Sequence, residues 1–168
     1  MTEPEKLVPL SQALQMLNTG AEAQASLFIE TYWQLKERLG REEAREILRQ
    51  SMYEAYVKLG RETAEKIGRT DARGMAEARE LLYGAPVDGE GTKELADDIF
   101  IVEASGCTAY ELMQRWGVSD EELAFLSDAF CAADDGFVAG FNPEMKFDPP
   151  LRLMRGDDRC RWEHSTQK

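Results

Sequence analysis

The sequence lacks any long run of apolar residues. None of its apolar stretches approaches the roughly twenty residues that a helix needs to cross a bilayer. The N-terminal segment, MTEPEKLVPL, is charged and has no apolar core of the kind found in signal peptides. We therefore expect a protein that stays in the cytoplasm.

Positive charge is also in short supply. Lysine and arginine number 20 against 32 aspartates and glutamates, so the formal net charge is −12 at pH 7. A field of this sign repels phosphate backbones and anionic lipids, which argues against nucleic acid or a membrane surface as a partner. An anionic small molecule would need a locally basic pocket.

Cysteine and histidine are scarce: the chain has Cys107, Cys131 and Cys160, and His164 is its one histidine. An odd number of widely spaced cysteines does not suggest a disulfide framework, so we expect free thiols in a reducing compartment. The short Cys-x-x-Cys and His-x-x-x-His pairs that usually anchor a zinc site are missing. A metal held by these four side chains is therefore a minority interpretation, and we predict no cofactor.

Helical spacing of apolar residues dominates the first half of the chain. A hydrophobic content of 43% in 168 residues is typical of one globular domain, which we expect to span residues 1–168. The pattern predicts a helical scaffold over residues 1–83, with Gly20 ending a first short helix and Gly60 weakening or breaking a later one. The expected helices span residues 1–20, 21–39, 42–67 and 71–83.

Residues 84–94, GAPVDGEGTKE, are rich in glycine and acidic residues and predict a loop. We interpret it either as a plain connection or as a lid. β-Branched and aromatic residues then predict a buried strand over residues 98–105. Thr108 and Glu111 form a capping-box pattern that would start a short helix ending at Trp116.

The last third predicts one longer helix and a hairpin. Ser119 and Glu122 repeat the capping-box pattern and open a helix to Phe141, and strands over residues 146–155 and 159–164 follow. Pro149 and Pro150 require the start of a strand or a sheet edge. The expected fold is α+β, with an N-terminal helical layer packed on a small antiparallel sheet formed by the C-terminal half, residues 95–164. Its apolar helix faces allow a homo-oligomer without requiring one.

Cys107 is the residue that physical chemistry favours as a nucleophile. It lies between a predicted buried strand and the start of a predicted helix. The unpaired N–H groups of that helix would lower the pKa of the thiol and stabilise an oxyanion-like centre nearby. The alternative is a small buried residue that fills the junction between strand and helix.

Cys131 has acidic neighbours. Asp128, Asp134 and Asp135 lie three or four residues away along the predicted helix and would raise the pKa of its thiol, which argues against a resting thiolate. A carboxylate beside a thiol could still act as a general base. The alternative is an acidic, solvated helix face that carries an incidental cysteine.

Cys160, Trp162 and His164 alternate along the last predicted strand, so we expect all three on one face. If this face closes over the helices, they enter the same interior as the other cysteines. Histidine is suited to proton transfer near neutral pH. His164 lies four residues from the C-terminus, however, where chains often fray, and we interpret it as exposed or structural rather than catalytic.

Four motifs of the last sixty or so residues occur in a characteristic order: a cysteine after a strand, a Cys-x-x-Asp segment, a Phe-x-Pro element and a Gly-Asp-Asp-x-Cys hairpin with an aromatic residue. Here they are Cys107, Cys131 with Asp134, residues 141–143 and residues 156–162. In these places the chain resembles the L-2-amino-thiazoline-4-carboxylic acid hydrolase family. The resemblance implies hydrolytic opening of a small cyclic isothiourea-like ring. It favours Cys107, then Cys131, as the nucleophile, with Asp134 positioning or activating water.

A substrate of that kind carries a carboxylate, and the predicted hairpin is rich in arginine. One of these arginines, for which we take Arg155, could hold the carboxylate through a bidentate contact, with Cys160 and Trp162 lining the substrate site. Arginines on a short hairpin can equally be solvent-facing edge residues.

Two other functions fit the same residues. A helical layer on a small sheet with a cysteine-lined cavity could bind or sense a small molecule without turnover. A member of the family could also catalyse an isomerisation or an elimination on a related ring.

Overall fold

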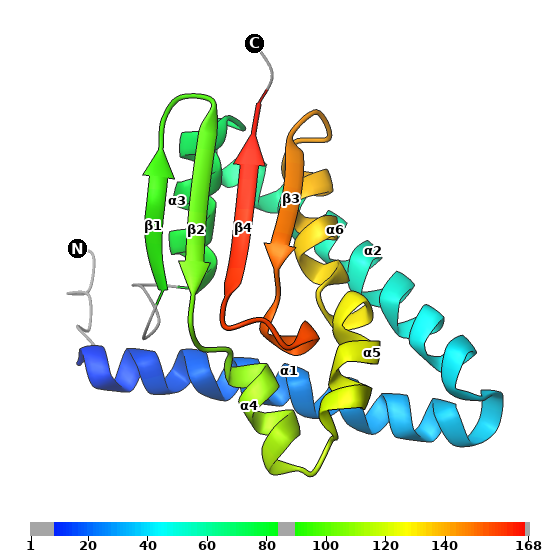
Figure 1. Ribbon diagram of the computed structural model, residues 1–168. Helices are drawn as coiled ribbons and strands as arrows, with labels where there is room; N and C mark the ends of the chain where they lie inside the picture. The colour runs from blue at the N-terminus through cyan, green and yellow to red at the C-terminus, as the bar shows by residue number, and fades with distance from the viewer. Residues whose placement is uncertain (1–8, 84–89, 167–168) are drawn as a thin grey trace, which may run out of the picture.

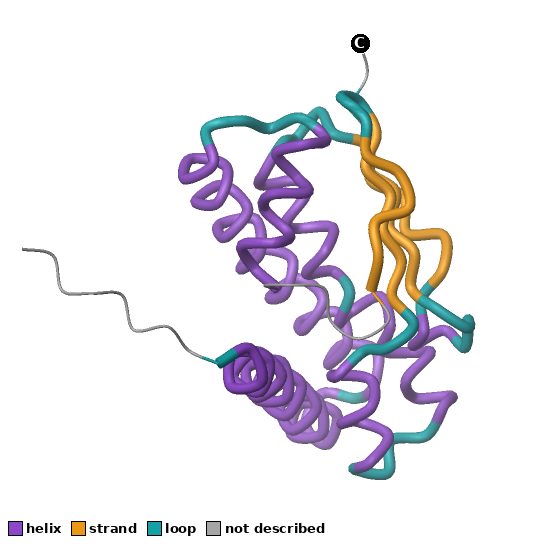
Figure 2. The backbone as a smooth tube through the Cα atoms, turned by 90° about the vertical axis from the view of Figure 1, so that its left-hand side faces the viewer, coloured by secondary structure: helices purple, strands orange, loops and turns teal. Residues whose placement is uncertain are grey.

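The computed structural model describes residues 9–83 and 90–166, in which six α-helices accompany one four-stranded antiparallel sheet. The helices gather against one face of the sheet and beneath one end of it, and the other face is open (Figures 1 and 2). This arrangement confirms the expected α+β class. None of the described helices is both long and apolar enough to cross a membrane.

Three helices form the N-terminal layer. Gly20 lies inside the first of them, so the expectation that it ends a short helix was wrong. A glycine in a helix interior lowers stability by only about 1 kcal/mol, which a long helix tolerates. The break comes instead at Gly40, whose φ of 92° is a conformation that side chains disfavour. The helices are α1 (Leu10–Leu39), α2 (Arg41–Ile67) and α3 (Ala72–Tyr83).

Gly60 does not weaken α2, because it is a point of close helix packing. The helix runs unbroken through Gly60, and its backbone lies directly against that of α6 (Ala132–Phe141). Glycines of both helices make this approach possible. A Cβ atom added to any of three would meet a backbone oxygen of the other helix: Gly60 at 2.2 Å from Phe137 O, Gly136 at 2.3 Å from Tyr53 O and Gly140 at 2.0 Å from Val57 O.

The sheet has the strand order β1-β2-β4-β3. Residues 90–94, which we expected in a loop, belong to β1, because pairing with the edge of β2 outweighs their weak strand propensity. The rest of that expected loop, residues 84–89, lies outside the described residues. Pro149 and Pro150 lie in the edge strand β3 at a register irregularity, as predicted. The strands are β1 (Glu90–Leu95), β2 (Ile99–Ala104), β3 (Lys146–Leu151) and β4 (Cys160–Ser165).

The expected helix over residues 120–141 is two helices, α5 (Asp120–Phe130) and α6, which meet at Cys131. The cause is that the two halves pack into different cores. Side chains of α5 such as Leu123 join a cluster with α1, α2 and α4. Side chains of α6 such as Phe137 join a second cluster with α3 and the sheet. One straight helix cannot serve both clusters.

The caps and the hairpin differ in part from expectation. The Ser119 hydroxyl accepts a hydrogen bond from the Glu122 N–H at 3.2 Å, which confirms this cap. Thr108 is not a cap but the first residue of α4 (Thr108–Arg115), and Cys107 occupies the N-cap position. The strand expected over residues 146–155 ends at Leu151, and a 3-10 turn, η1 (Leu153–Arg155), follows it.

Candidate functional site

The three cysteines come from distant parts of the chain, and the charge of one carboxylate, that of Asp134, acts on all of them. Cys107 precedes α4, Cys131 joins α5 to α6, and Cys160 begins β4. All three thiols are free. Asp134 lies in the first turn of α6, and its charge contributes to a raised pKa at each thiol. That these four residues form one site stays a prediction.

Burial keeps these thiols protonated at neutral pH. It is the main cause that raises the pKa of Cys131 well above its usual value and that of Cys160 to about 11. Burial also raises the pKa of Cys107, against the pull of the backbone N–H groups of Ala109 and Tyr110. The expectation of a lowered pKa at Cys107 was therefore wrong. The helix start contributes as predicted, but loss of solvent outweighs it.

Asp134 is a partly buried carboxylate with a defined partner. The Trp162 Nε1–H donates a hydrogen bond to its Oδ2 atom at 3.0 Å. Burial raises the pKa of Asp134, although this hydrogen bond and the charges of Arg79 and Arg152 act in the opposite direction. A carboxylate with a raised pKa is a better proton acceptor than an exposed one, which suits a general base.

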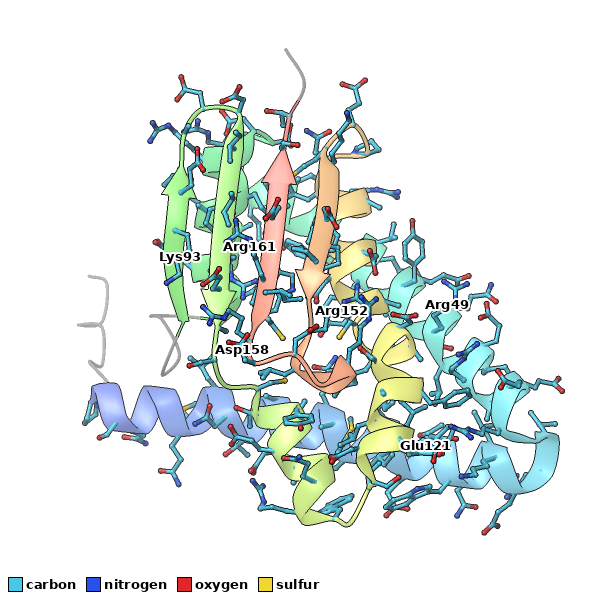
Figure 3. The ribbon with its side chains drawn as sticks, viewed as in Figure 1. Arg49, Lys93, Glu121, Arg152, Asp158 and Arg161 are labelled. Atoms are coloured by element: carbon cyan, nitrogen blue, oxygen red, sulfur yellow. The ribbon has the colours of Figure 1, made fainter. Side chains whose placement is uncertain are left out.

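Arg152, one of the arginines of the predicted hairpin, is a buried cation. Its side chain is 5% exposed, and its Nη1 atom lies 3.0 Å from Asp128 Oδ1. Its Nε atom has no hydrogen-bond partner among the described residues. Its charge lowers the pKa of Cys131 and Cys160, so it lies beside the thiols. Figure 3 shows it next to the end of β3 and α5. No sequence pattern distinguished it from the other arginines of this region.

The predicted anchor Arg155 is placed differently. It is 43% exposed on η1 and is bound to Asp128 at 2.8 Å. It lies at the rim of the thiol cluster, where its role in binding stays a prediction. Arg159 and Arg161 pair with Glu103 on β2. Figure 3 shows Arg161 on the sheet face opposite the helices, where the solvent-facing interpretation of these two arginines fits.

A small cavity lies beside Asp134. Its volume is about 20 Å³. The Arg79 guanidinium, missed by the sequence analysis, stacks on the Trp162 ring at 4.4 Å. Trp162 and His164 both line the cavity, so they project from one face of β4 as predicted. The other lining residues are Met75, Arg79, Leu82, Asp134, Phe137, Val138 and Phe147.

His164 is structural in its surroundings and is neither exposed nor frayed. It is 4% exposed, and its Nδ1 atom lies 3.1 Å from the Phe100 carbonyl oxygen. Burial lowers its pKa to about 4. The ring is therefore neutral at physiological pH. Over residues 9–83 and 90–166, no three histidine, cysteine or acidic side chains are grouped as metal ligands would be.

Two solved structures share this fold at low sequence identity. A trafficking protein particle complex subunit 3 from Naegleria fowleri, covalently bound to palmitic acid, matches with a TM-score of 0.56 and 13% identity over 89% of this chain and 96% of that one. The phenol-responsive sensory domain of the transcription activator PoxR, with phenol, matches with a TM-score of 0.53 and 15% identity, covering 87% of this chain and 74% of that chain. No curated protein sequence matches the chain.

A family model also matches the sequence. The family model of L-2-amino-thiazoline-4-carboxylic acid hydrolase matches residues 20–163. The match thus includes the N-terminal helices, in which the sequence showed no signature. Because it extends over most of the sequence, from α1 to β4, the chain belongs to the L-2-amino-thiazoline-4-carboxylic acid hydrolase family.

Proposed function

We propose that the protein hydrolyses a small cyclic compound of the L-2-amino-thiazoline-4-carboxylate type, with a cysteine as the nucleophile. The observation that supports this proposal is the electrostatic action of the Asp134 carboxylate on Cys107, Cys131 and Cys160, in a chain of this family. The reacting centre would be the ring carbon that is bonded to both nitrogen and sulfur.

Cys107 is the first choice for the nucleophile because backbone N–H groups act on its sulfur and would stabilise negative charge that develops there. Its thiol is protonated at neutral pH, so attack needs a base. Asp134 accepts the S–H proton as the sulfur adds to the ring carbon. A ring bond from this carbon to sulfur or nitrogen then breaks, and the proton passes to the leaving atom. Cys131 is the second choice.

Water completes the reaction. Its oxygen adds to the carbon now bound to the Cys107 sulfur, and Asp134 accepts its proton. The carbon–sulfur bond to the enzyme breaks, and the proton returns to the thiolate. The balance is one water added and one ring bond opened, with the enzyme restored. Asp134 thus acts as the base in both halves of the reaction.

The test is to incubate the purified protein with 2-amino-thiazoline-4-carboxylate and to follow the small molecule by mass spectrometry. The expected product has gained one water. Asp134→Asn should lower kcat/KM by about 10²–10⁴-fold, the usual range for a general base. Asp148→Asn, an exposed aspartate of β3, is the matched control and should leave the rate unchanged. Full activity in both Cys107→Ala and Cys131→Ala would end the covalent proposal.

A second function, binding of a small molecule without turnover, has its own support. The fold is similar to that of a phenol-responsive sensory domain, and the cavity beside Trp162 has mostly apolar walls. Saturable binding measured by calorimetry, with a ligand recovered unchanged, would favour this function. A product of unchanged mass but a different NMR spectrum would favour an isomerisation, and a loss of mass an elimination.

A further inference from the structure

The cavity beside Asp134 has the size of a site for one water molecule. Its volume is about 20 Å³, and roughly 10–15 Å³ is enough to hold a water. A thiazoline ring with its carboxylate is several times larger than a water molecule, so this volume does not hold it. The walls are mostly apolar, but four polar side chains also line the cavity: Arg79, Asp134, Trp162 and His164.

His164 offers a hydrogen-bond acceptor at this site. A carbonyl oxygen can only accept, so the Nδ1 atom that faces the Phe100 oxygen at 3.1 Å must carry the proton. The other ring nitrogen, Nε2, is then unprotonated and accepts. Burial holds the pKa of His164 at about 4, which preserves this state at neutral pH.

Asp134 offers a second acceptor. Its Oδ2 atom already receives the Trp162 Nε1–H, and its other carboxylate oxygen can accept a further hydrogen bond. A water has two protons to donate. If the water donates one proton to Asp134 and the other to His164, the lone pairs of its oxygen stay available for attack on an electrophilic carbon.

We propose that this cavity holds the hydrolytic water, and that His164 is the residue that positions it for Asp134. The inference rests on the proposed function and deepens it. In the second half of the reaction the water oxygen bonds to the substrate carbon, its proton passes to Asp134, and the carbon–sulfur bond to the enzyme breaks. Because Asp134 lines the cavity and its charge acts on the thiols, one carboxylate serves both halves.

Two substitutions of His164 separate positioning of water from a purely structural role. Glutamine can place its amide oxygen near the site of Nε2 and keeps the acceptor, but it lacks the donor to Phe100. Asparagine can place its amide N–H near the site of Nδ1 and keeps the bond to Phe100, but it lacks the acceptor. The two variants therefore each remove one function of the ring.

With the thiazoline substrate, His164→Asn should lower kcat by about 10–100-fold with little change in KM, whereas His164→Gln should retain most of kcat. The magnitude is below that of losing the base itself, because Asp134 remains. A structural role alone predicts the reverse order. That order, or equal kcat in both variants, would overturn the proposal. Urea unfolding of both variants separates loss of rate from loss of fold.

A high-resolution crystal structure tests the water site without any turnover. We expect an ordered water within hydrogen-bond distance of Asp134 and of His164 Nε2 in the wild type and its loss or displacement in His164→Asn. A dry cavity in the wild type overturns the inference even if the enzyme is active. A protein that binds this water but opens no cyclic isothiourea would instead overturn the proposed function, and with it the reactive role of the water.

Discussion

Replacing Gly140 by alanine should separate the two most closely packed helices of the molecule. The new Cβ would lie 2.0 Å from Val57 O, where ordinary contact begins near 3.4 Å, a shortfall of 1.4 Å. The next atoms it meets, Val57 C at 2.8 Å and Cα at 2.9 Å, are also backbone, so no side chain can turn aside to make room. One helix must move.

The magnitude follows from two opposing terms. Overpacking usually destabilises a core by about 1–3 kcal/mol, and a backbone clash belongs at the upper end of this range. Alanine improves helix propensity by about 1 kcal/mol over glycine. The free energy of unfolding should therefore fall by about 2 kcal/mol. Activity should fall further than the folded fraction, because α6 carries Asp134 and its movement disturbs the contact with Trp162.

The assay is urea unfolding followed by far-ultraviolet circular dichroism, with Gly20→Ala as the matched control. Gly20 also lies inside a helix, but a Cβ there meets nothing within 4 Å. Only the propensity term applies, so this variant should gain about 0.5–1 kcal/mol. If Gly140→Ala proves as stable as Gly20→Ala, the close approach of α2 and α6 is refuted.

Three further predictions concern a cap, a buried histidine and a buried arginine. Ser119→Ala should lower the free energy of unfolding by about 1 kcal/mol because it removes a helix cap, whereas Thr108→Ala should change it little, and equal losses in urea melts would contradict this assignment. His164 takes up a proton near pH 6.5 in the unfolded state but only near pH 4 in the folded state. Its contribution to the free energy of unfolding is therefore complete above pH 6.5, and about 3 kcal/mol of it is lost as the pH falls to 4. The stability of the wild type relative to His164→Asn should therefore fall by about 3 kcal/mol between pH 7 and pH 4, and parallel stability curves would contradict this. Arg152→Met should raise the pKa of Cys160 above about 11, seen as slower alkylation at a given alkaline pH, and unchanged kinetics would mean that the guanidinium does not act on this thiol.

Local patterns predicted the elements that local chemistry determines. The helical spacing of apolar residues located the N-terminal layer, and the Ser119 cap was read correctly from its side chain and spacing. β1 was missed because its residues are polar and glycine-rich, and only pairing with β2 makes them a strand. The helix break at Cys131 was missed because both halves have the same helical period. Only the existence of two cores distinguishes them.

In the candidate site, too, the sequence predicted what local chemistry determines and missed what tertiary structure determines. Motif order brought forward the three cysteines and Asp134, and in the folded chain the charge of Asp134 acts on all three thiols. The direction of the Cys107 pKa shift was wrong, because burial is a property of the tertiary structure and a helix start is a property of the sequence. Arg79 was missed, and Arg155 was preferred to Arg152, for the same reason. Nothing in the local sequence says which arginine of a basic segment is buried beside a carboxylate.

Asp134 itself offers the sharpest separation of stability from function. Its pKa is raised in the folded protein, so the ionised form opposes folding above the ordinary carboxyl pKa, and this penalty is relieved as the pH falls through the raised value. Asparagine keeps an oxygen to accept the Trp162 N–H and removes the buried charge. Asp134→Asn should therefore be at least as stable as the wild type at pH 7 in urea melts, and inactive. A variant that is both inactive and markedly less stable would mean that the carboxylate holds the two cores together. A residue that lowers the free energy of unfolding is not explained by the needs of the fold alone. A catalytic base has this property.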